Sequence, residues 1–298
     1  MIELAVLIHA GFLKGAPLLW ATLGGAYSER SGVINIGLEG MMLIGAFAAM
    51  TGAGLTGCPW IGLLLGAVCG GLLGLVHAWV SLYWKADQIV SGMGINVFAF
   101  GLTGFLLYKI FGARGNSSAV NKLPWVQWGN GDWWSVLIFP LSPLHLLLLL
   151  VLAVTLYLFY HTRFGLRLRA CGEDPSVVQS AGISVNFYRY TCVALSGMLA
   201  GLGGAQLSIS DINQFSVGMS NGRGFIALAA LICSGWRPGR AALICILFGI
   251  VEALAERLQA VFPDLPSRAL LALPFIFALL VLSLSRQTGK PPQALGKV

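Results

Sequence analysis

The sequence is poor in charged residues and lacks the common catalytic motifs. Charged side chains make up 10% of its 298 residues, whereas a soluble domain contains about 25%. There is no G-x-x-x-x-G-K-[ST] phosphate loop, no H-E-x-x-H and no G-x-S-x-G. The six cysteines form no C-x-x-C pair, which argues against a metal site or a disulfide framework. We therefore predict a chain that is not an enzyme and that binds no cofactor or metal ion.

Histidine is also scarce. The four histidines stand alone, near the ends of apolar runs, where we interpret them as interfacial residues: His9, His77, His145 and His161.

Apolar runs dominate what is present. The chain is 57% hydrophobic, and several runs reach the length of about 20 residues that crosses a bilayer as a helix. The formal charge of +7 is scattered among the connecting loops, which indicates membrane topology rather than nucleic-acid binding. We expect an all-α polytopic membrane protein with about eight to ten transmembrane helices, forming one transmembrane domain over residues 1–298. The expected spans are Leu4–Gly25, Val33–Gly52, Pro59–Leu82, Ile89–Phe111, Leu144–Tyr160, Tyr188–Ile209, Phe225–Ser234, Ala241–Leu258 and Ala269–Ser285.

Two of these runs are irregular. Lys14 and Pro17 interrupt the first, which predicts a kinked or half-inserted helix. The run Phe225–Ser234 is too short to span alone, and basic residues lie on both sides of it. This pattern is typical of a broken helix that is buried among its neighbours.

The distribution of basic residues predicts the orientation, because lysine and arginine are enriched in cytoplasmic loops. The loops with Arg30, Lys85, Arg169 and Arg237, together with the C-terminal tail, hold most of them. We therefore expect the N-terminus outside and the C-terminus in the cytoplasm.

The longest outer loop then spans residues 112–143 and contains four tryptophans, Trp125, Trp128, Trp133 and Trp134. Tryptophans at this place form an interfacial belt at headgroup depth, or a surface on which an extracytoplasmic binding protein docks.

The stretch Tyr27–Met50 carries a carboxylate inside an apolar helix. Glu39 is expected roughly two turns into that helix, where an ionised side chain must face protein or water. Asn35 lies four residues earlier, so the two should share one face and one polar network. Glu39 is a packing residue, a gating residue or a substrate ligand; we favour packing or gating.

Further polar residues are expected at membrane depth. Asp87 is placed to cap the fourth span, while Ser91 and Asn96 lie deeper and line a translocation path or serve packing. Asn221 and Arg223 precede the short broken helix, whose N-terminus favours negative charge.

Arg223 suits a hydroxyl-rich or anionic cargo, or it forms a structural ion pair with Asp211. Glu252 and Glu256 share one helix face, and their like charges repel unless Arg257 or another base lies near.

The cytoplasmic loop of residues 161–189 contains a short helix with clear ends. Asp174 followed by Pro175 is a strong N-terminal signal, and Gly182 is a natural C-cap, so a helix is predicted over Pro175–Ala181. Such a helix is a connector or the part that a motor subunit grips.

Four motifs decide between these alternatives. SERSGVINIGLEGM, A-D-x-I-V-S-G, NGRGFIALAALI and G-x-x-P-x-x-x-x-x-A-G-I-x-V resemble motifs of the permease subunits of bacterial ABC importers. The similarity is to the branch that takes up ribose-like sugars and nucleosides, and most of all to the shorter permease of nucleoside-type systems.

The resemblance implies the ABC importer permease fold in a bacterial inner membrane. It also implies three protein partners: an ABC ATPase, a second permease and an extracytoplasmic substrate-binding protein. It assigns ATPase coupling to Asp174, Pro175, Ala181 and Gly182. The candidates for the translocation path are Asn35, Glu39, Ser91, Asn96, Asn221 and Arg223.

The expected cargo is a purine nucleoside first, then a simple sugar, then a branched-chain amino acid. The alternative function is a secondary transporter or channel with Glu39 or Glu252 as an ion site, and a subunit without a pore is a third.

Overall fold

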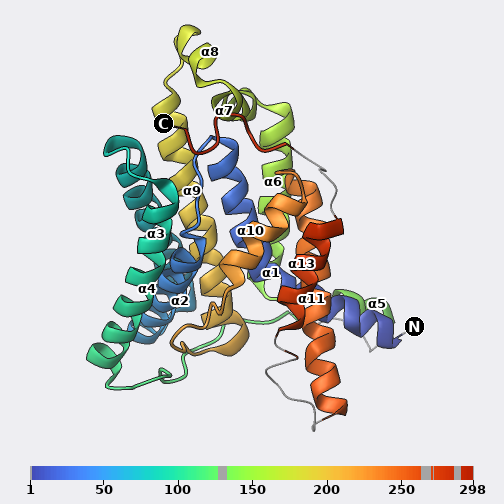
Figure 1. The fold of residues 1–298 in the computed structure, drawn as a ribbon. Coiled ribbons are helices and arrows are strands. Elements are labelled where there is room, and N and C mark those ends of the chain that lie inside the picture. The colour runs from blue at the N-terminus through green and yellow to red at the C-terminus, as the bar shows by residue number, and fades with distance from the viewer. Residues whose placement is uncertain (1, 127–132, 263–269, 271, 285–289, 298) are drawn as a thin grey trace.

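The structure is a computed structural model. It describes all residues except 1, 127–132, 263–269, 271, 285–289 and 298, and it is a bundle of helices (Figure 1). Two helices continue as π-helical turns: α3 into Trp79–Tyr83, and α9 into Gln206–Ile212. The helices are α1 (Ile2–Arg30), α2 (Leu38–Thr56), α3 (Pro59–Ala78), α4 (Gln88–Phe111), α5 (Trp133–Ile138), α6 (Pro143–His161), α7 (Arg163–Glu173), α8 (Pro175–Ser180), α9 (Val185–Ala205), α10 (Arg223–Cys233), α11 (Pro238–Val261) and α13 (Leu273–Leu284).

The expected all-α membrane fold is confirmed. Six helices within the described residues are long and apolar enough to cross a membrane: α1, α2, α3 with its π turn, α4, α6, and α9 with its π turn. α11 has the length of a span but contains several charged residues, and α10 and α13 are shorter. The first run is one helix of 29 residues that continues through Pro17. Figure 1 shows its N-terminal part leaving the bundle at an angle to the rest.

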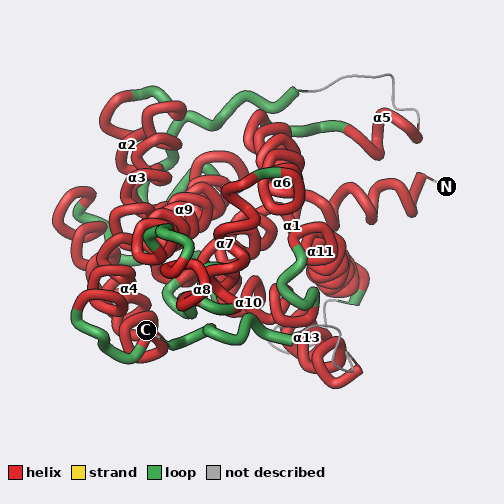
Figure 2. Tube along the Cα trace, turned by 90° about the horizontal axis from the view of Figure 1, so that it is seen from above, coloured by secondary structure: helices red, strands yellow, loops and turns green. Residues whose placement is uncertain are grey.

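The core is built on α1, α2 and α9. Figure 2 shows α1 between α9 on one side and α11 on the other. Trp20 on α1 is fully buried, and its indole N–H donates to the side chain of Gln206 at the end of α9. Glycines bring the backbones together, since a Cβ on Gly201 would overlap the backbone of Gly66 on α3. Close approach through small residues is how membrane helices gain packing without a hydrophobic driving force.

A break between α1 and α2 corrects one prediction. α1 ends at Arg30 and α2 begins at Leu38, with turns and extended chain between them. Glu39 therefore lies in the first turn of α2, not two turns inside a helix. The apolar run that begins at Val33 continues into α2, so hydropathy places the start of this helix too early.

The described part of the loop of residues 112–143 is anchored to the chain that leads into α10. The backbone N–H groups of Ser117 and Val120 donate to the carbonyls of Phe215 and Asn213, at 2.8 and 2.9 Å. Trp125 donates its indole N–H to the carbonyl of Ser210 at 3.1 Å, so this tryptophan has a structural role.

The other tryptophans of this loop do not decide between an interfacial belt and a docking surface for a binding protein. Trp133 is exposed at the start of α5. Trp128 and the side chain of Trp134 lie outside the described residues.

The opposite end of the bundle carries α7 and α8, near the C-terminus (Figure 1). The sequence does not predict α7, because the segment Arg163–Glu173 is too rich in charge for a membrane span. The described part of the C-terminal tail, residues 290–297, crosses this end of the bundle and forms turns over residues 293–296. The backbone N–H of Ala294 donates to Gly172, and that of Gly296 donates to Gly32.

Candidate functional site

Glu39 is the centre of the site. Its two carboxylate oxygens accept hydrogen bonds from the backbone N–H groups of Gly222, at 2.8 Å, and Gly224, at 2.7 Å. These donors belong to the N-cap and first turn of α10, where the N–H groups have no partner within the helix. A negative charge there is also favoured by the helix dipole. Glu39 thus caps α10 from the first turn of α2, and one carboxylate links the N-terminal ends of these two helices.

The glycines around this cap follow from the same geometry. Gly222 has φ +80°, a conformation that side chains other than glycine rarely adopt. A Cβ on Gly224 would overlap the backbone of Glu39. The G-x-G pattern of the motif is therefore the pattern that lets Glu39 reach α10.

Asn96 holds the start of α2 from the neighbouring helix α4. Its side-chain oxygen accepts from the Gly40 N–H at 2.8 Å, and its side-chain N–H donates to the Ile36 carbonyl at 3.0 Å. Both functions of the amide are thus used, so Asn96 fixes the break before α2 and also lines the space beside Glu39.

The sequence predicts that Asn35 shares a polar network with Glu39, but in the structure the two side chains have separate partners. Asn35 is fully buried in the irregular chain before α2, and its side-chain N–H donates to the hydroxyl of Ser196 at 2.9 Å. The two residues do not lie on one helix face, because α2 begins only after Asn35.

A cavity of about 270 Å³ lies beside this cap. It is lined by Glu39, Asn96, Phe100 and Asn221, together with the chain from Gly218 to Gly222. The Phe100 ring is exposed, and Asn221 is exposed at a left-handed turn with φ +46°. Within the described part of the chain, no hydrogen bond engages the side-chain amide of Asn221, which leaves it available to a ligand.

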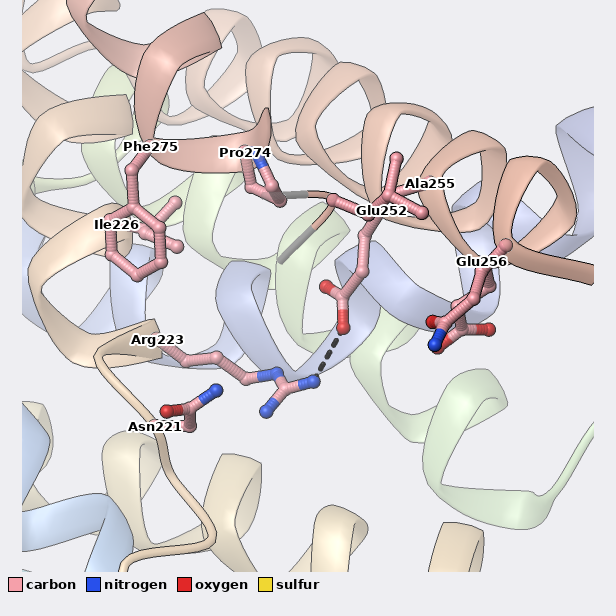
Figure 3. A pocket seen from close by; sticks show the side chains of 10 residues that line it. Asn221, Arg223, Ile226, Glu252, Ala255, Glu256, Pro274 and Phe275 are labelled. Carbon is pink, nitrogen blue, oxygen red and sulfur yellow. Dashed lines mark hydrogen bonds and ion pairs between the residues drawn. The ribbon is translucent and has the colours of Figure 1, made fainter. Parts of the chain in front are cut away.

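Arg223 faces the other side of the α10 N-terminus. Its Nη2 atom lies 2.5 Å from Oε1 of Glu252 on α11, across a narrow cavity of about 60 Å³ that Asn221 and Phe275 also line (Figure 3). Both side chains are largely buried, at 19% and 20% exposed. The alternative of a structural ion pair between Arg223 and Asp211 is therefore wrong: Arg223 pairs with Glu252 instead.

Glu256 pairs separately with Lys14 of α1, at 2.5 Å. Each of the two glutamates of α11 therefore has a basic partner, Arg223 for Glu252 and Lys14 for Glu256.

These contacts balance the charges around the two cavities. Glu39 occupies the positive end of α10, and Glu252 neutralises Arg223. The expectation that Arg223 and the helix end would attract an anion is not supported by this arrangement. What remains for a ligand is an amide, backbone groups and aromatic rings, which suit an uncharged polar molecule.

Ser91 does not line either cavity. Its hydroxyl lies 2.9 Å from Nδ1 of His77, whose Nε2 lies 2.9 Å from the carbonyl of Ile34. His77 and His145 are fully buried, so their interpretation as interfacial histidines is wrong. His145 contacts the hydroxyl of Ser142 and the side chain of Gln206. Neither network could be read from the sequence, since each joins separate helices. Asp87 caps α4 as predicted, accepting from two backbone N–H groups.

The short helix α8, at the end of the bundle opposite the loop of residues 112–143, has the predicted N-cap and ends within one residue of the predicted boundary. Oδ1 of Asp174 accepts from the backbone N–H groups of Ser176 and Val177 and from the Ser176 hydroxyl, and these hydrogen bonds hold the pKa of Asp174 below its usual range. Gly182 has φ +74°, and its N–H donates to Gln179 at 2.9 Å. With Ala181 as its C-cap, α8 ends one residue before the predicted boundary.

A comparison with known families decides the family of this bundle. The model of the family described as "Branched-chain amino acid transport system / permease component" matches residues 7–284. The chain belongs to this family. The resemblance of its four motifs to ABC importer permeases is thereby confirmed, and the permease is a multi-pass membrane protein.

Three relatives resemble the permease over most of its length. The nucleoside ABC transporter permease protein NupC of Lactococcus lactis subsp. cremoris is 35% identical, with 98% of this chain and 96% of the relative covered. The guanosine ABC transporter permease protein NupQ of Bacillus subtilis is 35% identical, with the same coverage. The putative glucose ABC transporter permease protein TsgC13 of Haloferax volcanii is 34% identical, with 90% of this chain and 82% of the relative covered.

Proposed function

We propose that the permease is one membrane subunit of an ATP-driven, binding-protein-dependent importer whose cargo is an uncharged nucleoside, a purine nucleoside first. The observation that carries the cargo class is the charge balance at α10, where Glu39 and Glu252 neutralise the positive groups. The names of NupC and NupQ support the same class, and that of TsgC13 makes a simple sugar the second candidate.

The cavity beside Glu39 offers the contacts that a nucleoside needs. The exposed ring of Phe100 can stack on a base, and stacking on an aromatic ring is tolerant of base identity. The free amide of Asn221 can donate to and accept from a ribosyl hydroxyl or a base edge. Asn96 and Glu39 keep this wall in place, whereas Asn35 and Ser91 brace the chain behind it.

ATP hydrolysis is assigned to a separate subunit that grips α8. The helix is bounded at both ends, and Val177 is exposed on it. Closure of the ATPase would move α8 together with α7 and α9, to which it connects. This is two-state coupling, in which ATP binding favours one arrangement of the bundle. The proposal places α8 and the C-terminus in the cytoplasm and the N-terminus outside.

A second permease is proposed to complete the path. Next to the cavity, α4 exposes large apolar side chains, including Met93, Val97 and Phe100. A second membrane subunit packed near this face would close the open side of the cavity. The alternative of an ion-driven transporter is disfavoured, since both carboxylates offered as ion sites are engaged, Glu39 by two N–H groups and Glu252 by Arg223.

Cargo class is tested by competition. The assembled importer in proteoliposomes would take up radiolabelled guanosine while unlabelled guanosine, ribose or guanosine monophosphate is added in excess. We expect guanosine to compete and the charged monophosphate to fail. Uptake of radiolabelled ribose without any uptake of guanosine would keep the importer and replace the cargo, and competition by the monophosphate would contradict the charge-balance argument.

A further inference from the structure

A third cavity lies at the end of the bundle that carries α7, far from α10's N-terminus. It measures about 400 Å³, within the range of about 300–1,000 Å³ of ligand pockets. The helices α1 and α6 end there, and the connection between α10 and α11 passes beside them. The cavity is lined by Arg30, Phe159, Tyr160, Arg169, Trp236 and Arg237; we call it the three-arginine pocket.

Two of the three arginines are held in place by the surrounding chain. Nε of Arg30 donates to the Trp236 carbonyl at 3.0 Å, and its Nη2 donates to the Gly235 carbonyl at 3.4 Å. The guanidinium of Arg169 lies over the ring of Tyr160, 5.7 Å from its centroid. Arg237 is the exposed N-cap residue of α11. Two sides of the pocket are therefore preformed, and Arg237 is a surface side chain at its rim.

The positive charge of this pocket exceeds the negative charge around it. Glu173 is half exposed, and its carboxylate lies 3.7 Å from Nη1 of Arg30. Glu29 lies beneath the pocket, where it accepts the indole N–H of Trp236. In the described part of the chain, no carboxylate forms an ion pair with Arg169 or Arg237. Even with Glu29 ionised, three guanidinium groups face two carboxylates.

The N-terminus of α11 adds to the positive charge of the pocket. This helix of 24 residues begins at Pro238, and the side chain of Arg237 forms no cap. The N–H groups of a first turn lack partners within the helix and carry partial positive charge. Guanidinium groups bind phosphate oxygens through paired, charge-assisted hydrogen bonds.

We propose that the three-arginine pocket binds a phosphate group at the membrane surface, supplied by the headgroup of an anionic phospholipid or by a soluble phosphate. The position favours the lipid. The pocket lies where two membrane helices end, and Tyr157 and Tyr160 are exposed in the last turns of α6. Tyrosine and tryptophan are enriched at membrane–water interfaces. Basic pockets between membrane helices are known to hold such headgroups. A bound phosphate would join α1, α7 and the α10–α11 connection through their arginines.

The test measures binding to the purified full-length permease in neutral detergent, independently of transport. One arm titrates phosphatidylglycerol against phosphatidylcholine and counts bound lipid by native mass spectrometry. A second arm adds inorganic phosphate as competitor. The variant Arg169→Gln/Arg237→Gln removes two pocket arginines, and Arg163→Gln/Arg240→Gln is the control, with the same change in charge at exposed positions of the same end that do not line the pocket.

We expect phosphatidylglycerol to bind at least about tenfold more tightly than phosphatidylcholine, and the pocket variant to lose about tenfold or more, the effect of losing one charge-assisted hydrogen bond. The control should lose less than about twofold, because surface charge alone acts weakly. Saturable binding of inorganic phosphate that depends on Arg169 and Arg237, without a preference for phosphatidylglycerol, would assign the pocket to a soluble phosphate. Equal losses in both variants, or no binding of either ligand, would overturn the proposal.

Discussion

Oε2 of Glu39 accepts the backbone N–H of Gly224 at 2.7 Å, although 185 positions separate the two residues. The other oxygen accepts the Gly222 N–H, so one carboxylate satisfies two N–H groups at the start of α10. The start of a broken helix would otherwise leave these donors unpaired inside the bundle, where water is scarce. Any movement of α2 relative to α10 must therefore either carry this cap along or break it.

The cap predicts the behaviour of Glu39→Gln. The glutamine oxygen can accept one N–H, but its NH₂ group then faces the second donor. We expect a loss of about 1–3 kcal/mol in the free energy of unfolding and a marked fall in uptake. Thermal unfolding in detergent and uptake in proteoliposomes measure the two effects.

Glu256→Gln is the matched control for this substitution. It removes a carboxylate from an exposed pair with Lys14, so it should change stability by less than about 0.5 kcal/mol. A Glu39→Gln variant as stable and as active as this control would refute the capping role.

The pair of Arg223 and Glu252 predicts an energetic coupling. Both side chains are about one-fifth exposed, between the surface and buried extremes. A double-mutant cycle with Arg223→Gln and Glu252→Gln should give a coupling of about 1–2 kcal/mol. The same cycle on Lys14 and Glu256, whose side chains are 38% and 57% exposed, should give about 0.5 kcal/mol or less. Equal couplings in the two cycles would show that burial does not strengthen the inner pair.

Gly182→Pro is predicted to separate ATP hydrolysis from transport. Proline cannot adopt the φ of +74° and lacks the N–H that donates to Gln179. The end of α8 should unwind while the membrane helices stay folded. We expect near-normal thermal unfolding, with cargo uptake per ATP hydrolysed lowered at least about tenfold. Gly182→Ala, which keeps the N–H, should have an intermediate effect. Normal ATP-driven uptake by the proline variant would remove α8 from the coupling path.

Asp174 predicts a pH dependence of the same helix. Its carboxyl has a lowered pKa in the folded chain, first through the Ser176 hydroxyl and then through two backbone N–H groups. A lowered folded pKa stabilises the helix above the unfolded pKa, and this contribution is lost as the pH falls through the folded value. Protection of the α8 amides from hydrogen exchange, corrected for the intrinsic rate, should thus be constant near neutral pH and fall only below about pH 4.

Two variants check this assignment. Asp174→Asn keeps a good cap without a titrating group, so its protection should not show the acid loss. Asp174→Ala should lower protection at every pH. An acid loss in the asparagine variant equal to that of the natural chain would place the titrating group elsewhere.

The sequence was sufficient for the features that depend on local chemistry. Apolar runs of about 20 residues predicted the membrane helices, because lipid leaves few alternatives to a helix. Asp174, Pro175 and Gly182 predicted α8 nearly to the residue, since caps act over three or four positions. The apolar run after Arg223 predicted the broken helix α10, because it is too short to span a membrane alone and has basic residues on both sides.

The site itself needed the structure, because its contacts join distant parts of the chain. Glu39 looked like a buried carboxylate without a partner until α10 supplied its donors. Arg223 was matched with Asp211, twelve positions away, although Glu252 lies against it on another helix. Hydropathy does not locate the start of α2, because the chain from Val33 is as apolar as the helix, and it does not detect α7, because that segment is too rich in charge for a span.

The central claim is ATP-driven import, and one measurement tests it most directly. The permease would be reconstituted in proteoliposomes with its ATPase, second permease and binding protein, and the uptake of radiolabelled guanosine would be followed as each component, and ATP, is omitted in turn. We expect uptake only when ATP and the binding protein are both present, and no response to a proton or sodium gradient. Uptake that follows an ion gradient without the ATPase would contradict the account.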